Sequence, residues 1–153
     1  MELYRGFYAV INALNKNGLA YSVVGGIALA FHALPRFTRD INILAHPADL
    51  PRYREVFQGL GYSEMAAPWT FKNTDITLHR FGKPSVEDDQ DLILVDLLIG
   101  NEDVHAAIIE QSIVDESPAG KVCLATREDL MKMKRIRGSK QDEADIEKLE
   151  GSE

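Results

Sequence analysis

One carboxylate in this sequence lies inside an apolar segment, where burial of a charged side chain is energetically costly. Asp96 stands inside the run from Leu92 to Ile99, which is otherwise apolar. Side chains alternate between the faces of a strand, so this pattern predicts a central strand that is covered on both faces. Burying an uncompensated carboxylate costs several kcal/mol. Asp96 is therefore protonated, paired with an arginine such as Arg39, or placed at the open end of a sheet where it faces a ligand.

Two more oxygen donors lie on an earlier predicted strand. Asp40 and Asn42 are two residues apart, so their side chains point the same way, while Ile41 and Ile43 point into a core. Two such donors and a third carboxylate from a neighbouring strand make a site for a hard cation, and Mg²⁺ favours such sites. A strand edge wetted by solvent is the alternative for the Asp-x-Asn pattern alone.

A glycine pair follows a short apolar strand. Gly25 and Gly26 come directly after the strand predicted over 20–24 and before a short predicted helix. Glycines at such a point allow the backbone to approach a ligand closely, and a helix N-terminus favours an anion such as phosphate. An ordinary tight turn is the alternative for the pair alone.

The elements that position these residues alternate between helices and strands. Spacing of apolar residues and the turn residues between them predict helices over 3–14, 27–34, 48–60, 104–111, 127–137 and 142–150. Strands are predicted over 20–24, 40–45, 62–65, 69–72, 76–81, 92–99 and 122–125. This order predicts one domain over 1–153 of the α/β (α+β) class. A central mixed sheet is flanked by helices, with C-terminal helices from about residue 127.

Composition and charge restrict the class of partner. The net charge of −7 disfavours binding to long nucleic acid, because a polyanion is repelled. The longest apolar run is too short to span a bilayer, and a single cysteine excludes an intramolecular disulfide. We therefore expect a cytoplasmic protein. A basic cluster, Lys132 to Lys140, is either a solvated helix face or a contact for phosphate or a short RNA end.

The order of these motifs resembles the nucleotidyltransferase superfamily of the DNA polymerase beta type. The matching segments are Val23-Val24-Gly25-Gly26, then Thr38-x-Asp40-Ile41-Asn42-Ile43, then Val95-Asp96-Leu97. The tail, from Asp129-Leu130 through Lys134 to Ala144-Asp145-Ile146, is similar to the end of small bacterial members of minimal or toxin type. The resemblance covers about residues 20–149.

The resemblance implies a reaction and a role for each residue. In the family, two Mg²⁺ ions activate an acceptor hydroxyl and hold a nucleoside triphosphate, whose nucleoside monophosphate is transferred. Carried over, Asp40, Asn42 and Asp96 hold the ions, and Asp40 and Asp96 are the catalytic acids. The nucleotide is bound by Gly25, Gly26, Arg39 and Lys134. The acceptor is a small molecule, a protein or an RNA end.

One position departs from the family pattern. Where the family has the second acid of an Asp-x-Asp pair, this chain has Asn42, which offers an oxygen but no charge and no base. Two hypotheses follow. The chain is a nucleotidyltransferase, or it is a weak or inactive nucleotidyltransferase fold that binds a nucleotide or a partner protein, as in a toxin–antitoxin pair. An unrelated α/β scaffold is the third reading.

Overall fold

The computed structural model describes residues 2–34, 38–88, 90–137, 147 and 150. Its helices are α1 (Glu2–Lys16), α2 (Gly25–Phe31), the 3-10 turn η1 (Pro47–Asp49), α3 (Leu50–Gly59), α4 (Asp103–Glu110) and α5 (Arg127–Arg137). Its strands are β1 (Ser22–Val24), β2 (Asp40–Ala45), β3 (Ser63–Glu64), β4 (Trp69–Thr70), β5 (Ile76–Pro84), β6 (Leu92–Gly100), β7 (Ile113–Ser117) and β8 (Gly120–Leu124). None of these helices is long and apolar enough to cross a membrane.

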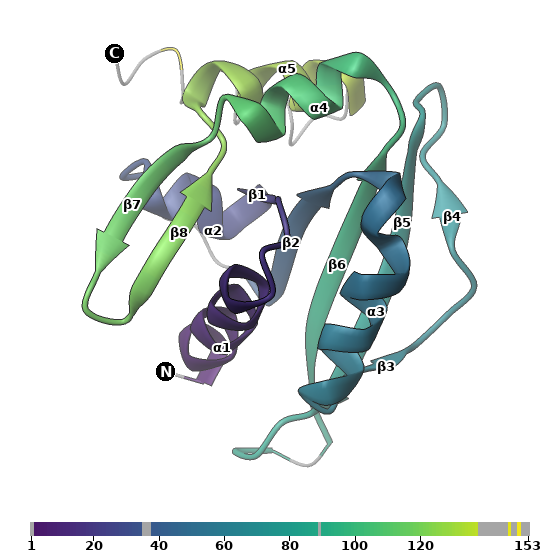
Figure 1. Ribbon diagram of the computed structural model, residues 1–153, viewed down its shortest axis with the longest axis vertical. Coiled ribbons are helices and arrows are strands. Elements are labelled where there is room, and N and C mark those ends of the chain that lie inside the picture. The colour runs from purple at the N-terminus through teal and green to yellow at the C-terminus, as the bar shows by residue number, and fades with distance from the viewer. Residues whose placement is uncertain (1, 35–37, 89, 138–146, 148–149, 151–153) are drawn as a thin grey trace.

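The strands form a mixed sheet in the order β3-β5-β6-β2-β1-β8-β7, with β4 paired to β5 (Figure 1). The pairs β2–β6 and β1–β8 are parallel, and the remaining pairs are antiparallel. The two long strands β5 and β6 pair along their whole length and place β6 in the interior of the sheet. The predicted α/β class with a central mixed sheet is confirmed.

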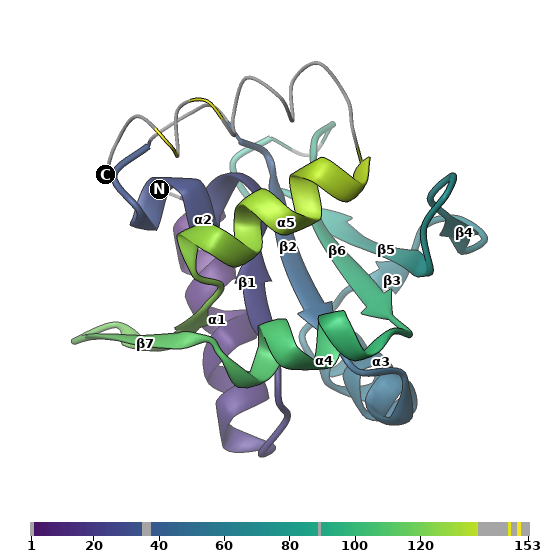
Figure 2. The same ribbon diagram turned by 90° about the horizontal axis from the view of Figure 1, so that it is seen from above.

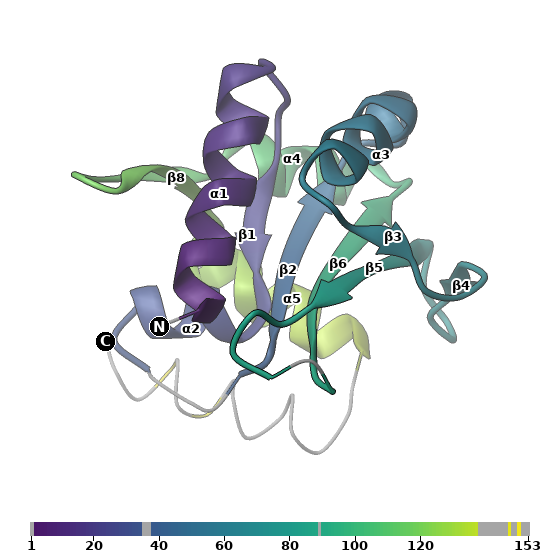
Figure 3. The ribbon, with the colours of Figure 1, turned by 90° about the horizontal axis from the view of Figure 1, so that it is seen from below.

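Helices cover both faces of the sheet. In Figure 2 the helices α4 and α5 lie in front of the strands, and in Figure 3 the helices α1 and α3 do. Apolar residues at helical spacing explain the α1 side, because Phe7, Val10, Ile11 and Leu14 are all fully buried. The rings of Phe57 in α3 and Phe81 in β5 pack edge to face, with centroids 5.0 Å apart. The face of β5 that carries Phe81 is therefore the α3 face.

Several predicted elements differ from the observed ones. The strand β2 has the predicted bounds, whereas α2 begins at Gly25, two residues before the predicted start, and ends at Phe31. The strand β7 was not predicted, because most of its residues are exposed and the apolar alternation is missing. The helix predicted over 142–150 lies largely outside the described residues.

Candidate active site

A row of cross-strand partners brings the predicted polar residues together. Arg80 of β5 is opposite Asp96 of β6, and Asp96 is opposite Asn42 of β2. Directly opposed residues share a face of the sheet. Asp40, two residues before Asn42, shares that face as well. The sheet therefore brings Asp40, Asn42 and Asp96 to one side, the side of α4 and α5, as their spacing predicted.

Asp96 is held by an arginine on the neighbouring strand. Arg80 donates from Nε to Asp96 Oδ1 at 2.7 Å and from Nη2 to Asp96 Oδ2 at 2.9 Å. The Asp96 side chain is only 3% exposed, and the Arg80 side chain is about one third exposed. The hydrogen bond to Asp96 raises the pKa of Arg80. Paired donation of this kind compensates a carboxylate that would otherwise be costly to bury.

Asp40 differs from Asp96 in its surroundings. Its side chain is about one third exposed, and Arg80 Nη2 lies 3.9 Å from Asp40 Oδ2. Burial raises the pKa of Asp40, and the negative charge of Asp96 raises it further, while Arg80 and Arg39 oppose both effects. Asp40 therefore holds a proton more readily than an ordinary aspartate. Of the two carboxylates Asp40 and Asp96, Asp40 is therefore the one suited to accept a proton from a ligand.

The glycine pair makes room for side chains of β2 and of the segment just before it. Gly25 has a φ of +73°, and a Cβ on it would lie 2.6 Å from Asn42 Nδ2. A Cβ on Gly26 would lie 2.8 Å from the Thr38 side chain. The start of α2 can therefore pass directly against the Asn42 amide only because residue 25 is glycine, and against the Thr38 side chain only because residue 26 is glycine. This contact explains the pair structurally, and its contact with phosphate stays a prediction.

The structure places the two predicted basic residues differently. Arg39 is largely exposed and pairs with Asp91 at 3.2 Å. The alternative that an arginine pairs with Asp96 is therefore found, but the arginine is Arg80 and not Arg39, the example that the sequence suggested. Arg39 is nevertheless close enough for its charge to act on Asp40. Lys134 in α5 is 8% exposed, whereas Lys132 is exposed and pairs with Asp129 at 3.5 Å. Lys134 points inward on the helix that covers this side of the sheet, and its role with nucleotide stays a prediction.

The residues present do not fit a pair of magnesium ions as they stand. The described residues contain no group of three or more His, Cys, Asp or Glu side chains that could hold a metal ion. Both oxygens of Asp96 accept hydrogen bonds from Arg80, and Asn42 carries no charge. Of Asp40 and Asp96, only Asp40 offers a carboxylate that is not held by two hydrogen bonds from Arg80. The net charge of Asp40, Asp96 and Arg80 together is −1, which is little to hold two divalent cations.

Sequence reasoning missed Arg80 and Trp69. Arg80 lies 5.7 Å from the centroid of the Trp69 ring, so its guanidinium is between an indole and two carboxylates. The strand over 76–81 was predicted, but a lone arginine on it does not show which residue it faces. One pattern could have pointed to it: a charged residue inside a strand is a candidate partner for the one charge inside another strand.

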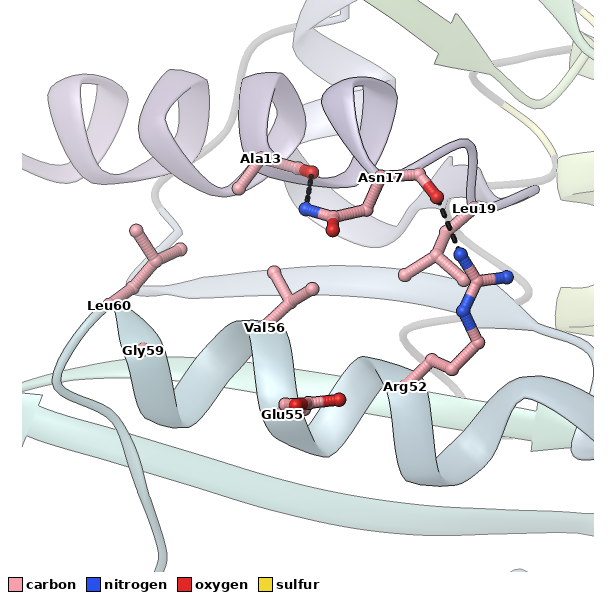
Figure 4. A pocket seen from close by; sticks show the side chains of 8 residues that line it. All are labelled: Ala13, Asn17, Leu19, Arg52, Glu55, Val56, Gly59 and Leu60. Atoms are coloured by element: carbon pink, nitrogen blue, oxygen red, sulfur yellow. Dashed lines mark hydrogen bonds between the residues drawn. The ribbon is translucent and has the colours of Figure 1, made fainter.

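A separate hollow lies on the opposite side of the sheet. It has a volume of about 350 Å³ between α1 and α3 and is lined by Ala13, Asn17, Leu19, Arg52, Glu55, Val56, Gly59 and Leu60 (Figure 4). Arg52 spans it and donates to the Asn17 carbonyl oxygen at 2.6 Å. No residue of the Asp40–Asp96 row lines it, so it has no part in the chemistry of that row.

No protein-family model and no curated protein matches this sequence. Solved structures do match. A candidate nucleotidyltransferase from Thermotoga maritima is 13% identical, with 98% of this chain and 93% of that chain covered and a TM-score of 0.66. The lincosamide antibiotic adenylyltransferase LnuA, with lincomycin bound, is 14% identical over 97% of each chain, with a TM-score of 0.57. ANT(2'')-Ia in complex with adenylyl-2''-tobramycin is 14% identical over 95% of this chain and 91% of that chain, with a TM-score of 0.55.

These matches cover nearly the whole chain, and each of the proteins is described as a nucleotidyltransferase or carries an adenylylated ligand. The chain therefore has the nucleotidyltransferase fold, as its motif order predicted. At this level of identity the likeness establishes the fold alone.

Proposed function

We propose that this chain binds a nucleoside triphosphate at the Asp40–Asn42–Asp96 row and transfers its nucleoside monophosphate to an acceptor. The observation that carries the proposal is the meeting of Asp40 and Asp96 on one sheet face next to the Gly25 turn, in a chain with the nucleotidyltransferase fold. A small-molecule acceptor is favoured, since LnuA and ANT(2'')-Ia were solved with lincomycin and adenylyl-tobramycin.

The chemistry follows from the environment of each group. The acceptor hydroxyl oxygen forms a bond to the α-phosphorus, the bond from that phosphorus to pyrophosphate breaks, and pyrophosphate leaves. Asp40 takes the hydroxyl proton, because its pKa is raised and its side chain is partly open. Asp96 fixes Arg80, and Arg80 supplies positive charge close to where charge develops on the phosphoryl oxygens.

Magnesium dependence, which the family resemblance implies, belongs to this proposal as a prediction. The row in its present arrangement does not fit two ions, so no step is assigned to them. Calorimetric titration of the protein with ATP, GTP, CTP and UTP, each with magnesium and with chelator, tests the prediction directly. Binding that is equally tight in chelator would contradict a magnesium requirement.

Transfer is tested with triphosphates labelled at the α-phosphate. The acceptor panel contains tobramycin, lincomycin, adenosine and a short RNA, so that small molecules and an RNA end are compared. We expect label in one small-molecule product. Asp40→Asn should abolish transfer, because the proton acceptor is lost, while Asp103→Asn on the exposed start of α4 should not. If no triphosphate binds and no label moves, the proposal fails.

A weak or inactive fold that only binds nucleotide or a partner protein is the second candidate. Two features favour it: Asn42 replaces an acid of the family pattern, and Arg80 occupies both oxygens of Asp96. The two candidates differ in one result. Tight triphosphate binding without any transfer to the panel, to water or to the protein itself favours the binding function.

A further inference from the structure

An apolar shelf adjoins the Arg80–Asp96 pair at the β4 edge of the sheet. It consists of Met65, Trp69 and Leu94. Trp69 of β4 is opposite Leu78 of β5, so its ring is on the same face as Arg80. The Arg80 guanidinium lies 5.7 Å from the centroid of the Trp69 ring, within the range of a cation–π contact. The shelf is therefore continuous with the candidate active site.

The rest of the shelf extends toward Asp40. A Cβ on Gly82 would lie 3.0 Å from Met65 Cγ and 3.1 Å from Leu94 Cδ2, so these two side chains meet over the glycine. Leu94 is directly opposite Asp40 in the β2–β6 ladder. Trp69 thus lies beside Arg80 at one end of the shelf, and Leu94 lies beside Asp40 at the other.

The shelf is open to solvent. Trp69 is 39% exposed and Met65 is 45% exposed, and Leu94 is partly buried. An apolar patch that is rimmed by charged groups is typical of a ligand-binding surface, in contrast to single scattered apolar residues. Trp69 is also the only tryptophan of the chain. Its side chain gives the patch a flat face on which a ring can stack.

The in-line geometry of phosphoryl transfer indicates which ligand lies on the shelf. Attacking and leaving oxygens lie roughly in line in phosphoryl transfer. Across the sheet, the order is the Gly25 turn after β1, then Asp40 and Asn42 on β2, Asp96 on β6, Arg80 on β5, and Trp69 on β4. If pyrophosphate leaves toward the Gly25 turn, the acceptor must enter from the opposite side, where the shelf lies.

We propose that the shelf of Met65, Trp69 and Leu94 is the acceptor subsite and takes a neutral or cationic ring compound that carries a hydroxyl group. The proposal rests on the proposed transferase function. The ring stacks on Trp69, and its hydroxyl group reaches past Leu94 toward Asp40. There the hydroxyl oxygen bonds to the α-phosphorus, pyrophosphate leaves, and the hydroxyl proton passes to the base of the proposed transferase reaction. The carboxylates at the end of the shelf and the net charge of −7 disfavour an anionic acceptor such as an RNA end.

The single tryptophan allows a direct test. In a spectrum of ¹⁵N-labelled protein, the one indole N–H signal belongs to Trp69. The acceptor panel of the transfer assay, and separately each triphosphate and tripolyphosphate, are added to the full chain. We expect tobramycin, lincomycin or adenosine to shift the indole signal saturably. We expect tripolyphosphate and the RNA to leave it in place.

Variants of Trp69 test whether the shift of the indole signal reflects binding of the ring compound. Trp69→Ala should weaken calorimetric binding of the active ring compound by about fivefold or more, which corresponds to about 1 kcal/mol of stacking. Trp69→Phe keeps an aromatic face and should retain most of the affinity, which separates loss of stacking from loss of folding. Ile113→Ala is the matched control, because Ile113 is 46% exposed on β7 at the other edge of the sheet. It should change nothing.

Three outcomes would overturn an assignment, and they differ from one another. If no ring compound shifts the indole signal while a triphosphate binds by calorimetry, the shelf is not an acceptor subsite, and the proposed function stands. If a triphosphate alone shifts the signal and Trp69→Ala weakens its binding equally, the shelf holds the nucleobase instead. If no triphosphate binds to the parent chain, the proposed function fails, and the acceptor subsite fails with it.

Discussion

Two rows of cross-strand partners lie one residue apart on the same strands and have opposite characters. Phe81, Val95 and Ile41 form the first row on the α3 face, and all three are fully buried. Arg80, Asp96 and Asn42 form the second row on the α4–α5 face. The strands, the pairing and the depth in the sheet are shared, so the rows differ mainly in side-chain chemistry.

The difference shows what holds each row in place. The apolar row is stabilised by burial and needs no particular geometry beyond packing. The polar row is tolerated only because Arg80 satisfies both oxygens of Asp96, and replacement of such a pair by apolar residues is often neutral or stabilising. A buried carboxylate whose neighbours Asp40 and Arg80 have shifted pKa values is a candidate for a functional site.

The largest effect on stability is expected in the apolar row. Phe81→Ala should lower the free energy of unfolding by about 4 kcal/mol, since it removes a buried ring and leaves a cavity. Urea denaturation measures the loss. Ile113→Ala, an exposed apolar change, should cost less than about 0.5 kcal/mol. At temperatures where Phe81→Ala remains folded, its affinity for nucleoside triphosphate should equal that of the parent. Reduced affinity would mean that the two rows are not separable.

A smaller loss is expected when the polar pair is broken. Arg80→Leu leaves Asp96 buried without its partner and should cost about 3 kcal/mol, at the low end for buried pairs because Arg80 is partly exposed. The double change of Arg80→Leu with Asp96→Leu should recover most of this loss and should not bind triphosphate. Denaturation of the parent, the single variant and the double variant measures their stability, and calorimetry measures their affinity for triphosphate. A double variant as unstable as Arg80→Leu would contradict the view that an unpaired charge causes the loss.

The next effect concerns the charge of the polar row. Asn42→Asp places a third carboxylate beside Asp96 and Asp40, and repulsion should lower stability in chelator by about 1 kcal/mol, the worth of roughly one pKa unit. Magnesium should restore the lost stability and tighten triphosphate binding, because the added negative charge attracts a divalent ion. Thermal melts with chelator and with magnesium measure both effects. A variant that magnesium does not stabilise would show that Asn42 does not border a metal site.

The two rows also show which features of the site can be predicted from the sequence. Alternation in β2 predicted that Ile41 points into the core and that Asp40 and Asn42 share a face, because side-chain direction in a strand is a local property. The convergence of Asp96 with these two residues was a prediction that the parallel register of β2 and β6 had to decide. The partner of Asp96 could not be predicted in this way. Arg80 and Asp96 meet through the register of β5 on β6, which is set by the packing of the whole sheet. The sequence could therefore suggest an arginine partner, with Arg39 as an example, but it could not single out Arg80.

For the glycine pair and the shelf as well, the sequence could not predict which side chains come into contact. Gly25 and Gly26 were recognised as a site of close approach, but the approaching groups are the side chains of Asn42 and Thr38. Trp69 lies on a strand of two residues with no periodicity to give its direction. Only its pairing with β5 places the ring beside Arg80.

The smallest expected effect comes from a titratable residue on the apolar face. His79 is opposite Leu97 and lies on the same face as Phe81, nearly buried, and its Nδ1 has no hydrogen-bond partner among the described residues. Burial lowers the pKa of His79 below its ordinary value of 6.5, the charge of Arg54 lowers it further, and Glu64 opposes both. The apolar face therefore keeps this histidine neutral, whereas the polar face keeps its charges.

The sign of the pH dependence follows from proton binding. Below pH 6.5 the unfolded chain takes up the His79 proton more readily than the folded protein, so stability falls as the pH falls from 6.5 through the lowered pKa. His79→Leu removes this linkage. Between about pH 7.5 and about pH 5.5 the parent should therefore lose about 1–2 °C more in melting temperature than the variant does. Thermal melts of both proteins in the same two buffers measure the two losses. The contributions of all other titrating groups cancel in the difference between them. Equal losses would mean that His79 becomes charged in the folded protein as readily as in the unfolded chain, and the contrast between an apolar and a charge-bearing face would then fail at this position.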